Sequence, residues 1–214
     1  MRSAIVAGVA ALAVTGCGSG GRQDANEPSG KFPVEVTTAT FPTAQRLAEH
    51  TKMVISVRNV GNKTIPNLAV TICNTTCAYP APVGEGTSVA AFARYLNQTG
   101  LASHSRQVWV VDQPPGQCSF SCINGGAGAD VSADANTWQA GRLRPGHTAT
   151  FQWALTAVAS GKFVVAWELA AGIYGKAKAT LPNGGHPAGT FAVNIAQAPA
   201  QSYVNDKGQV VQGQ

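Results

Sequence analysis

Residues 53–72 read Met-Val-Ile-Ser-Val-Arg-Asn-Val-Gly-Asn-Lys-Thr-Ile-Pro-Asn-Leu-Ala-Val-Thr-Ile. Two runs rich in β-branched residues, 53–60 and 65–72, flank the pair Gly61-Asn62, which is typical of a turn. Pro66 lies near the start of the second run, where a strand tolerates the loss of a backbone N–H donor. This stretch therefore predicts two consecutive strands joined by a turn.

Short apolar runs of the same kind recur on both sides of this stretch, and most are bounded by glycine or proline. Residues 34–41 alternate apolar and polar side chains, as a strand with one buried face does. The other runs predict strands at 108–111, 136–138, 149–158, 162–169, 176–181 and 190–195. Many short strands separated by turns predict an all-β sandwich, which we place at residues 33–197.

The composition describes a folded chain with a mostly neutral surface. Of the 214 residues, 44% are apolar and 12% are charged, whereas charged residues make up about 25% of an average soluble protein. This length suits one domain of ordinary size with a full core. The formal net charge of +5 is small and its lysines and arginines are dispersed, so we expect no nucleic-acid partner.

The regular succession of predicted strands is interrupted between about residues 73 and 135. We interpret this stretch as an insertion across one end of the sandwich. Thr87 suits a helix N-cap and Gly100 a helix stop, so we expect a short helix at 88–98. The insertion would either cover a sheet edge or act as a binding lid. The polar C-terminal tail, 198–214, predicts a small hairpin at 203–211.

The first 16 residues have the pattern of a signal peptide, because Arg2 precedes an apolar run that is too short to span a bilayer. The sequence Val14-Thr-Gly-Cys17 resembles a bacterial lipobox, in which Cys17 is acylated and becomes the first mature residue. Residues 17–32 have the composition of a flexible tether. We therefore expect an extracytoplasmic lipoprotein, anchored to the bacterial cell membrane through acylated Cys17. An ordinary secretory peptide with a spare cysteine is the alternative.

The other four cysteines, Cys73, Cys77, Cys118 and Cys122, form an even set suited to disulfides in an oxidising compartment. Residues four apart in an extended chain share a face, so two antiparallel segments would pair Cys73 with Cys122 and Cys77 with Cys118. We prefer this nested pairing because longer loops constrain the unfolded chain more. Local bridges within each Cys-x3-Cys motif and a four-cysteine zinc site are the alternatives.

The sequence offers no recognisable catalytic or cofactor motif. Its four histidines lie far apart, and neither H-E-x-x-H nor G-x-S-x-G occurs. Residues 130–136 resemble the start of a calcium loop, but Ala135 replaces the required glycine and Gly141 the final glutamate. We therefore expect a protein that is not an enzyme and that has no metal or cofactor.

The four tryptophans divide into two pairs by their position. Trp153 and Trp167 lie inside predicted strands, where a large aromatic residue usually anchors the core. Trp109 and Trp138 flank the insertion. We therefore expect Trp109 and Trp138 to be the residues that contact a partner.

Residues 57–72, 143–153 and 161–167 resemble the cell-adhesion-related (CARDB-like) domains of bacterial surface proteins. The shared features are an N-x-G turn, Asn59-Val-Gly, and an L-x-P-G turn, Leu143-Arg-Pro-Gly. The resemblance implies an immunoglobulin-like antiparallel sandwich without catalytic residues. It implies a binding or structural role at the cell envelope, in adhesion or in protein or glycan recognition. A small extracytoplasmic hydrolase and a solute-binding lipoprotein are the alternatives.

Overall fold

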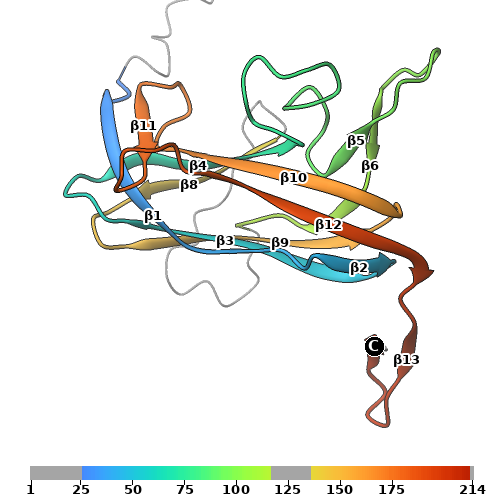
Figure 1. The fold of residues 1–214 in the computed structure, drawn as a ribbon. Helices are drawn as coiled ribbons and strands as arrows, with labels where there is room; N and C mark the ends of the chain where they lie inside the picture. Colours follow the sequence, from blue (N-terminus) through green and yellow to red (C-terminus); the bar gives the residue numbers. More distant parts are fainter. Residues whose placement is uncertain (1–25, 117–135, 213–214) are drawn as a thin grey trace, which may run out of the picture.

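The structure is a computed structural model that describes residues 26–116 and 136–212. These residues form two five-stranded β-sheets packed face to face, with two small hairpins attached (Figure 1). The first sheet has the strand order β11-β1-β3-β9-β7, and the second has the order β2-β12-β10-β4-β8. The all-β sandwich predicted from the sequence is confirmed.

The strands of the described residues are β1 (Gly30–Thr40), β2 (Ala44–Leu47), β3 (His50–Asn59), β4 (Ile65–Asn74), β5 (Ala93–Tyr95), β6 (Ser105–Gln107), β7 (Trp109–Gln113), β8 (Thr137–Leu143), β9 (Thr148–Ala157), β10 (Gly161–Ala170), β11 (Ala177–Thr180), β12 (Ala188–Pro199), β13 (Ser202–Val204) and β14 (Val210–Gln212). Every strand predicted from the sequence is present, with its ends shifted by a few residues. The tail hairpin predicted at 203–211 is β13 paired with β14. Neighbouring strands pair antiparallel, except that β11 runs parallel to β1 and β2 runs parallel to β12.

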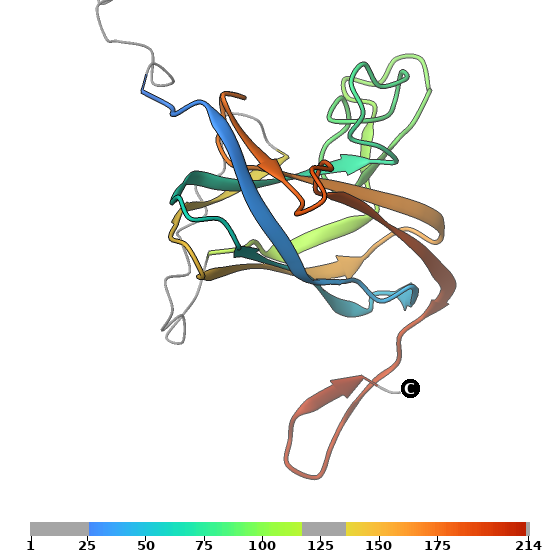
Figure 2. The same ribbon diagram turned by 60° about the vertical axis from the view of Figure 1, so that its left-hand side comes forward.

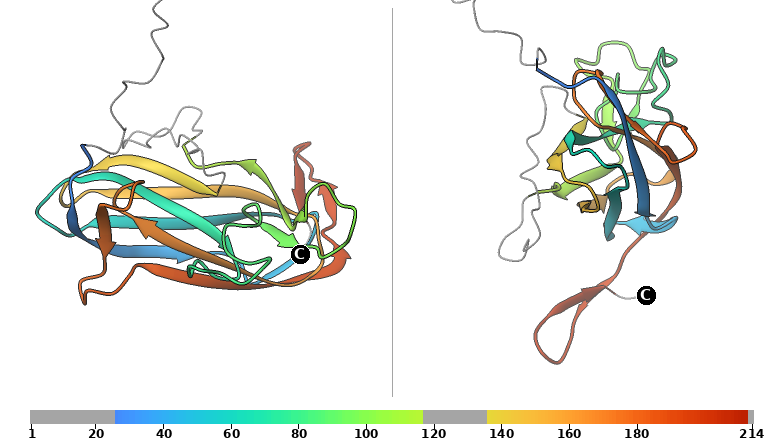
Figure 3. Two further views of the ribbon diagram at one scale, coloured as in Figure 1. Left: turned by 90° about the horizontal axis from the view of Figure 1, so that it is seen from above. Right: turned by 90° about the vertical axis from the view of Figure 1, so that its left-hand side faces the viewer.

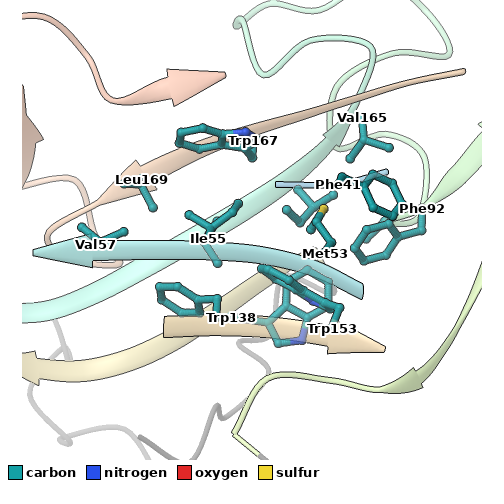
Figure 4. Close-up of a cluster of buried hydrophobic side chains, with 14 of the residues drawn as sticks. Phe41, Met53, Ile55, Val57, Phe92, Trp138, Trp153, Val165, Trp167 and Leu169 are labelled. Carbon is teal, nitrogen blue, oxygen red and sulfur yellow. The ribbon is translucent and has the colours of Figure 1, made fainter. Parts of the chain in front are cut away.

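The core lies between the two sheets and is rich in aromatic side chains (Figure 4). Alternate residues of β9 point inward, so that Phe151, Trp153 and Leu155 are all buried. Trp153 meets Trp138 of the opposite sheet edge-on, with ring centroids 5.4 Å apart. Large rings in this arrangement add attraction beyond the area that they bury.

The two turns that carry the resemblance bind each other. The side-chain amide of Asn59 donates to Lys63 O at 2.8 Å and to Leu143 O at 2.9 Å. The backbone N–H of Gly146 donates to Asn59 O at 2.8 Å. Gly146 has a φ of +75°, a conformation that favours glycine. The N-x-G and L-x-P-G turns thus form one hydrogen-bonded corner of the sandwich.

Residues 88–98 do not form the helix that the sequence predicted. They form a turn followed by β5, which pairs with β6. The backbone of this turn is bound by the buried amide of Asn136, which accepts from Ala91 N at 2.7 Å and donates to Val89 O at 2.8 Å. Phe92 has a φ of +61°, which no right-handed helix contains. Tertiary hydrogen bonds therefore replace the local bonds of a helix.

The sandwich is elongated and has two ends (Figure 3). We call proximal the end at which β1 begins; four strand connections lie there, residues 60–64, 144–147, 171–176 and 181–187. We call distal the opposite end, at which β4 stops and the described part of the insertion, residues 75–108, begins. Figure 2 shows the insertion and the C-terminal hairpin away from the start of β1. Within the described ranges, no helix has the length and apolarity needed to cross a membrane.

Candidate binding surface

The insertion begins with a disulfide bridge between Cys73 and Cys77, whose Cα atoms lie 5.3 Å apart. The predicted nested pairing is therefore wrong for these two cysteines. β4 ends at Asn74, and Thr75 follows with a φ of +66°. The chain is folded there and not extended, which brings the two Cα atoms within the roughly 7 Å limit for a bridge. Cys118 and Cys122 lie outside the described residues.

Residues 78–83, Ala-Tyr-Pro-Ala-Pro-Val, follow the bridge, and we call them the apolar loop. The side chain of Tyr79 is 99% exposed and that of Val83 is 90% exposed. Pro80 and Pro82 are also exposed. Prolines restrict the backbone, so the loop has few conformations to lose on binding. An aromatic side chain presented in this way is typical of an interaction surface.

The apolar loop is fixed at its base as well as at its start. Asn74 exchanges two backbone hydrogen bonds with Gly86, at 3.1 and 2.9 Å, and its side chain donates to Gly84 O at 3.0 Å. Gly84 is buried, and a Cβ there would lie 2.7 Å from the Tyr95 ring. Only glycine permits this close approach of the loop to β5. The disulfide and these contacts together attach the loop to β4 and β5.

Beneath the apolar loop, the insertion is part of the core. Val89, Phe92 and Val108 are each no more than 3% exposed. The ring of Phe92 lies 6.1 Å from Trp138 and 6.1 Å from Trp153, between centroids. The apolar loop therefore stands on a packed support and is not the tip of a long free segment.

Trp109 and Trp138, which we expected to contact a partner, are 1% and 5% exposed. That expectation is wrong. The Trp109 indole N–H donates to Gln45 Oε1 at 2.7 Å, and its ring packs against Phe41 at 5.3 Å between centroids. Trp138 packs against Trp153. Both rings fill the inside of the sandwich, and the exposed aromatic side chain of this region is Tyr79.

One cluster of His, Asp and Thr side chains has an outward resemblance to a catalytic triad. Thr156 donates from Oγ1 to Asp112 Oδ2 at 2.6 Å, and Thr156 Oγ1 lies 2.7 Å from His50 Nδ1. In a nucleophilic triad the imidazole stands between the hydroxyl and the carboxylate and uses both of its nitrogens. Here the same nitrogen faces both oxygens, and the His50 side chain is 70% exposed. The arrangement does not supply a proton relay.

Within residues 26–116 and 136–212, no group of three or more His, Cys, Asp or Glu side chains is placed to hold a metal ion. The zinc interpretation required four free thiolates, and two of the four cysteines are joined to each other. Most of the calcium-like stretch at 130–136 lies outside the described residues.

No family model matches the chain, and no curated protein matches it. Solved structures do resemble it. The CARDB domain of a Pyrococcus furiosus protein, solved with di-metal ions, is 11% identical with a TM-score of 0.38, over 78% of this chain and 93% of that one. Escherichia coli alpha-2-macroglobulin is 11% identical with a TM-score of 0.40, over 80% of this chain and 7% of that one. The resemblance to CARDB domains predicted from the sequence is confirmed; it gives no function.

Proposed function

We propose that this chain is a lipid-anchored, non-catalytic binding protein of the bacterial cell envelope, which presents its apolar loop to a protein or glycan partner. The observation that carries the proposal is the nearly complete exposure of Tyr79 on a loop braced by the Cys73–Cys77 bridge. An aromatic ring loses little side-chain entropy on binding. It can stack on a sugar face or fill a pocket in a protein.

The arrangement of the sandwich suits a protein held at one end. The chain enters β1 at the proximal end, and the apolar loop lies toward the distal end (Figure 3). The predicted tether, 17–32, is shortened by the fold, because Glu27 is held by Tyr174 and Ala177 and β1 begins at Gly30. A chain of about nine residues with the Gly- and Ser-rich composition of 18–26 would have a root-mean-square reach of roughly 16 Å. With Cys17 in the bilayer, the tether would keep the proximal end near the membrane and leave the apolar loop facing away from it.

The anchor is tested by the intact mass of the protein extracted from the membrane fraction of the producing bacterium. We expect a chain that begins at Cys17 and carries the added mass of acyl groups. A chain cut at another residue, or one without acyl mass, would contradict the lipid anchor.

The apolar loop is tested with two probes, purified cell-wall sacculi and a photo-crosslinking residue placed at position 79 in living cells. We expect the purified protein to sediment with sacculi or the residue at position 79 to give a discrete protein adduct. Tyr79→Ala should reduce sedimentation with sacculi at least fivefold. Tyr203→Ala is the matched control, because Tyr203 is 60% exposed on the C-terminal hairpin and should tolerate the change. Neither sedimentation nor an adduct, or an equal loss in both variants, would refute the role of the loop.

A further inference from the structure

The connections at the proximal end carry basic and imidazole side chains and no carboxylate. Residues 60–64, 144–147, 171–176 and 181–187 contain Lys63, Arg144, Lys176, His147 and His186, and no Asp or Glu. Carboxylates do lie close by: Glu168 contacts His186 at 3.1 Å, and Glu35 lies on β1. Glu27 precedes β1 and accepts the N–H groups of Tyr174 and Ala177, each at 3.1 Å. The four connections themselves therefore contribute three positive charges, from Lys63, Arg144 and Lys176, and no negative charge.

The connection at 171–176 also presents apolar side chains. Ile173 is 38% exposed and Tyr174 is 42% exposed, and Gly172 and Gly175 flank the pair. The carboxylate of Glu27 shapes this connection through the N–H groups that it accepts. An exposed aromatic residue beside an aliphatic one and a lysine has the amphipathic character of side chains at a membrane interface.

A pocket of about 460 Å³ lies beside this connection, between β11, the end of β10 and residues 184–186. Lys31 of β1 and Lys178 of β11 are register partners in the parallel pair, and both line the pocket with His186 and Thr180. Two ammonium groups and a hydroxyl group are donors that suit a phosphate group. Leu169 and Ala177 contribute apolar surface to the same pocket.

We propose that the proximal end docks on an anionic phospholipid surface, with Ile173 and Tyr174 in the headgroup layer and a lipid phosphate in the pocket between Lys31 and Lys178. Two observations select a membrane as the occupant. The outer connections bear cations and no carboxylate, which complements an anionic bilayer. Residues 1–25, with the lipobox-like Cys17, join the sandwich at this same end.

Docking would fix the orientation of the sandwich on the bilayer, whereas a flexible tether alone would let it rotate. The distal end, with the apolar loop, would then point away from the membrane. This inference deepens the proposed function and rests on it for one point, the attachment of the proximal end to the membrane through Cys17. The docking itself requires no acyl chain, so the two can be tested separately.

The test uses the chain from residue 17 onward with Cys17→Ser, which cannot be acylated, and vesicles of phosphatidylcholine with or without phosphatidylglycerol. We expect the protein to sediment with the anionic vesicles only, and less as the salt concentration rises. Lys31→Glu combined with Lys178→Glu should weaken vesicle binding at least tenfold, because each basic residue near an anionic surface contributes about fivefold.

The matched control is Lys52→Glu combined with Lys162→Glu, which makes the same change in net charge on exposed residues near the distal end. We expect this pair to alter vesicle binding less than twofold. Equal loss in the two pairs would show attraction by net charge alone and would overturn the docking proposal. Equal binding to both kinds of vesicle, or to neither, would overturn it as well.

The second arm separates a lipid phosphate from a soluble one. Ile173→Ser combined with Tyr174→Ser should weaken vesicle binding at least threefold without altering the salt dependence. Binding of inorganic phosphate can be measured by calorimetric titration. If the protein binds phosphate but does not bind vesicles, the pocket is a site for a soluble anion and the docking proposal is wrong. The intact-mass measurement tests acylation of Cys17, and its result does not depend on any of these vesicle-binding outcomes.

Discussion

The insertion and the C-terminal hairpin both extend from the distal part of the sandwich, but they are attached to it in different ways (Figure 2). The insertion places Val89 and Phe92 in the core, at 1% and 3% exposure. The hairpin of β13 and β14 pairs only with itself among the described strands. Its residues Tyr203, Val204 and Val210 are 60%, 64% and 73% exposed.

Apolar content does not explain this difference, because both segments contain valine and an aromatic residue. A buried side-chain amide outside the insertion hydrogen-bonds the backbone of the insertion, whereas the hydrogen bonds of the hairpin turn are exposed. Asn136 binds Val89 O and Ala91 N inside the protein. Asn205 binds the backbone N–H groups of Lys207 and Gln209 at the surface. A segment can enter a core only when its polar backbone groups find partners there.

The largest loss of stability is expected for Phe92→Ala, which tests whether the insertion is part of the core. Removing a buried ring that contacts Trp138 and Trp153 leaves a cavity in the core. We expect the free energy of unfolding to fall by about 3–5 kcal/mol. Chemical denaturation measures this loss. The control is Tyr203→Ala in the hairpin, which should change the value by less than about 0.5 kcal/mol. A loss below about 1 kcal/mol for Phe92→Ala would mean that the insertion is not part of the core.

The second test removes the buried amide. Asn136→Ala leaves Ala91 N and Val89 O without their partner inside the protein. We expect a loss of about 2–3 kcal/mol, because an unsatisfied buried polar group costs about 1–3 kcal/mol. Thermal unfolding followed by circular dichroism measures it. Asn205→Ala, an amide removed from the exposed turn, is the comparison and should cost less than about 1 kcal/mol. Equal losses for the two variants would remove the distinction between the segments.

The strands could be predicted from the sequence because their signal is local. Alternation in β1 indicates a strand with one buried face, and the β-branched runs of β3 and β4 indicate strands that are largely buried. The helix predicted at 88–98 was wrong because its signals, a cap at Thr87 and a stop at Gly100, are local and do not record tertiary hydrogen bonds. The partner that decides the conformation, Asn136, lies more than 40 residues away in the sequence.

The candidate surface could be predicted only in part. The sequence indicated a braced insertion, but it assigned the partner contacts to Trp109 and Trp138, which are buried. Position beside an insertion does not reveal which face of a strand a side chain occupies. The signal for Tyr79 was present, since prolines follow it closely and glycines close the loop. Its exposure depends on the turn at Thr75, whose positive φ no local pattern records.

The third test concerns the bridge that joins the apolar loop to β4. Cys73→Ala combined with Cys77→Ala should lower the free energy of unfolding by about 2 kcal/mol, the expected effect of closing so short a loop. Denaturation with guanidinium chloride measures the loss. Peptide mapping without reduction should also recover residues 73 and 77 linked to each other. A link from Cys73 or Cys77 to Cys118 or Cys122 would contradict the local pairing.

The smallest effect is expected from removing the hairpin by ending the chain after Ala200. An isolated two-stranded hairpin is marginally stable, and this one pairs with no strand of the two sheets among the described residues. The contact that secures β12 at this point, Ala200 N to Leu47 O at 2.7 Å, is retained. We therefore expect the free energy of unfolding to change by less than about 0.5 kcal/mol in chemical denaturation. A loss above about 1 kcal/mol would mean that the hairpin packs on the sandwich as the insertion does, because only buried contacts can supply that much.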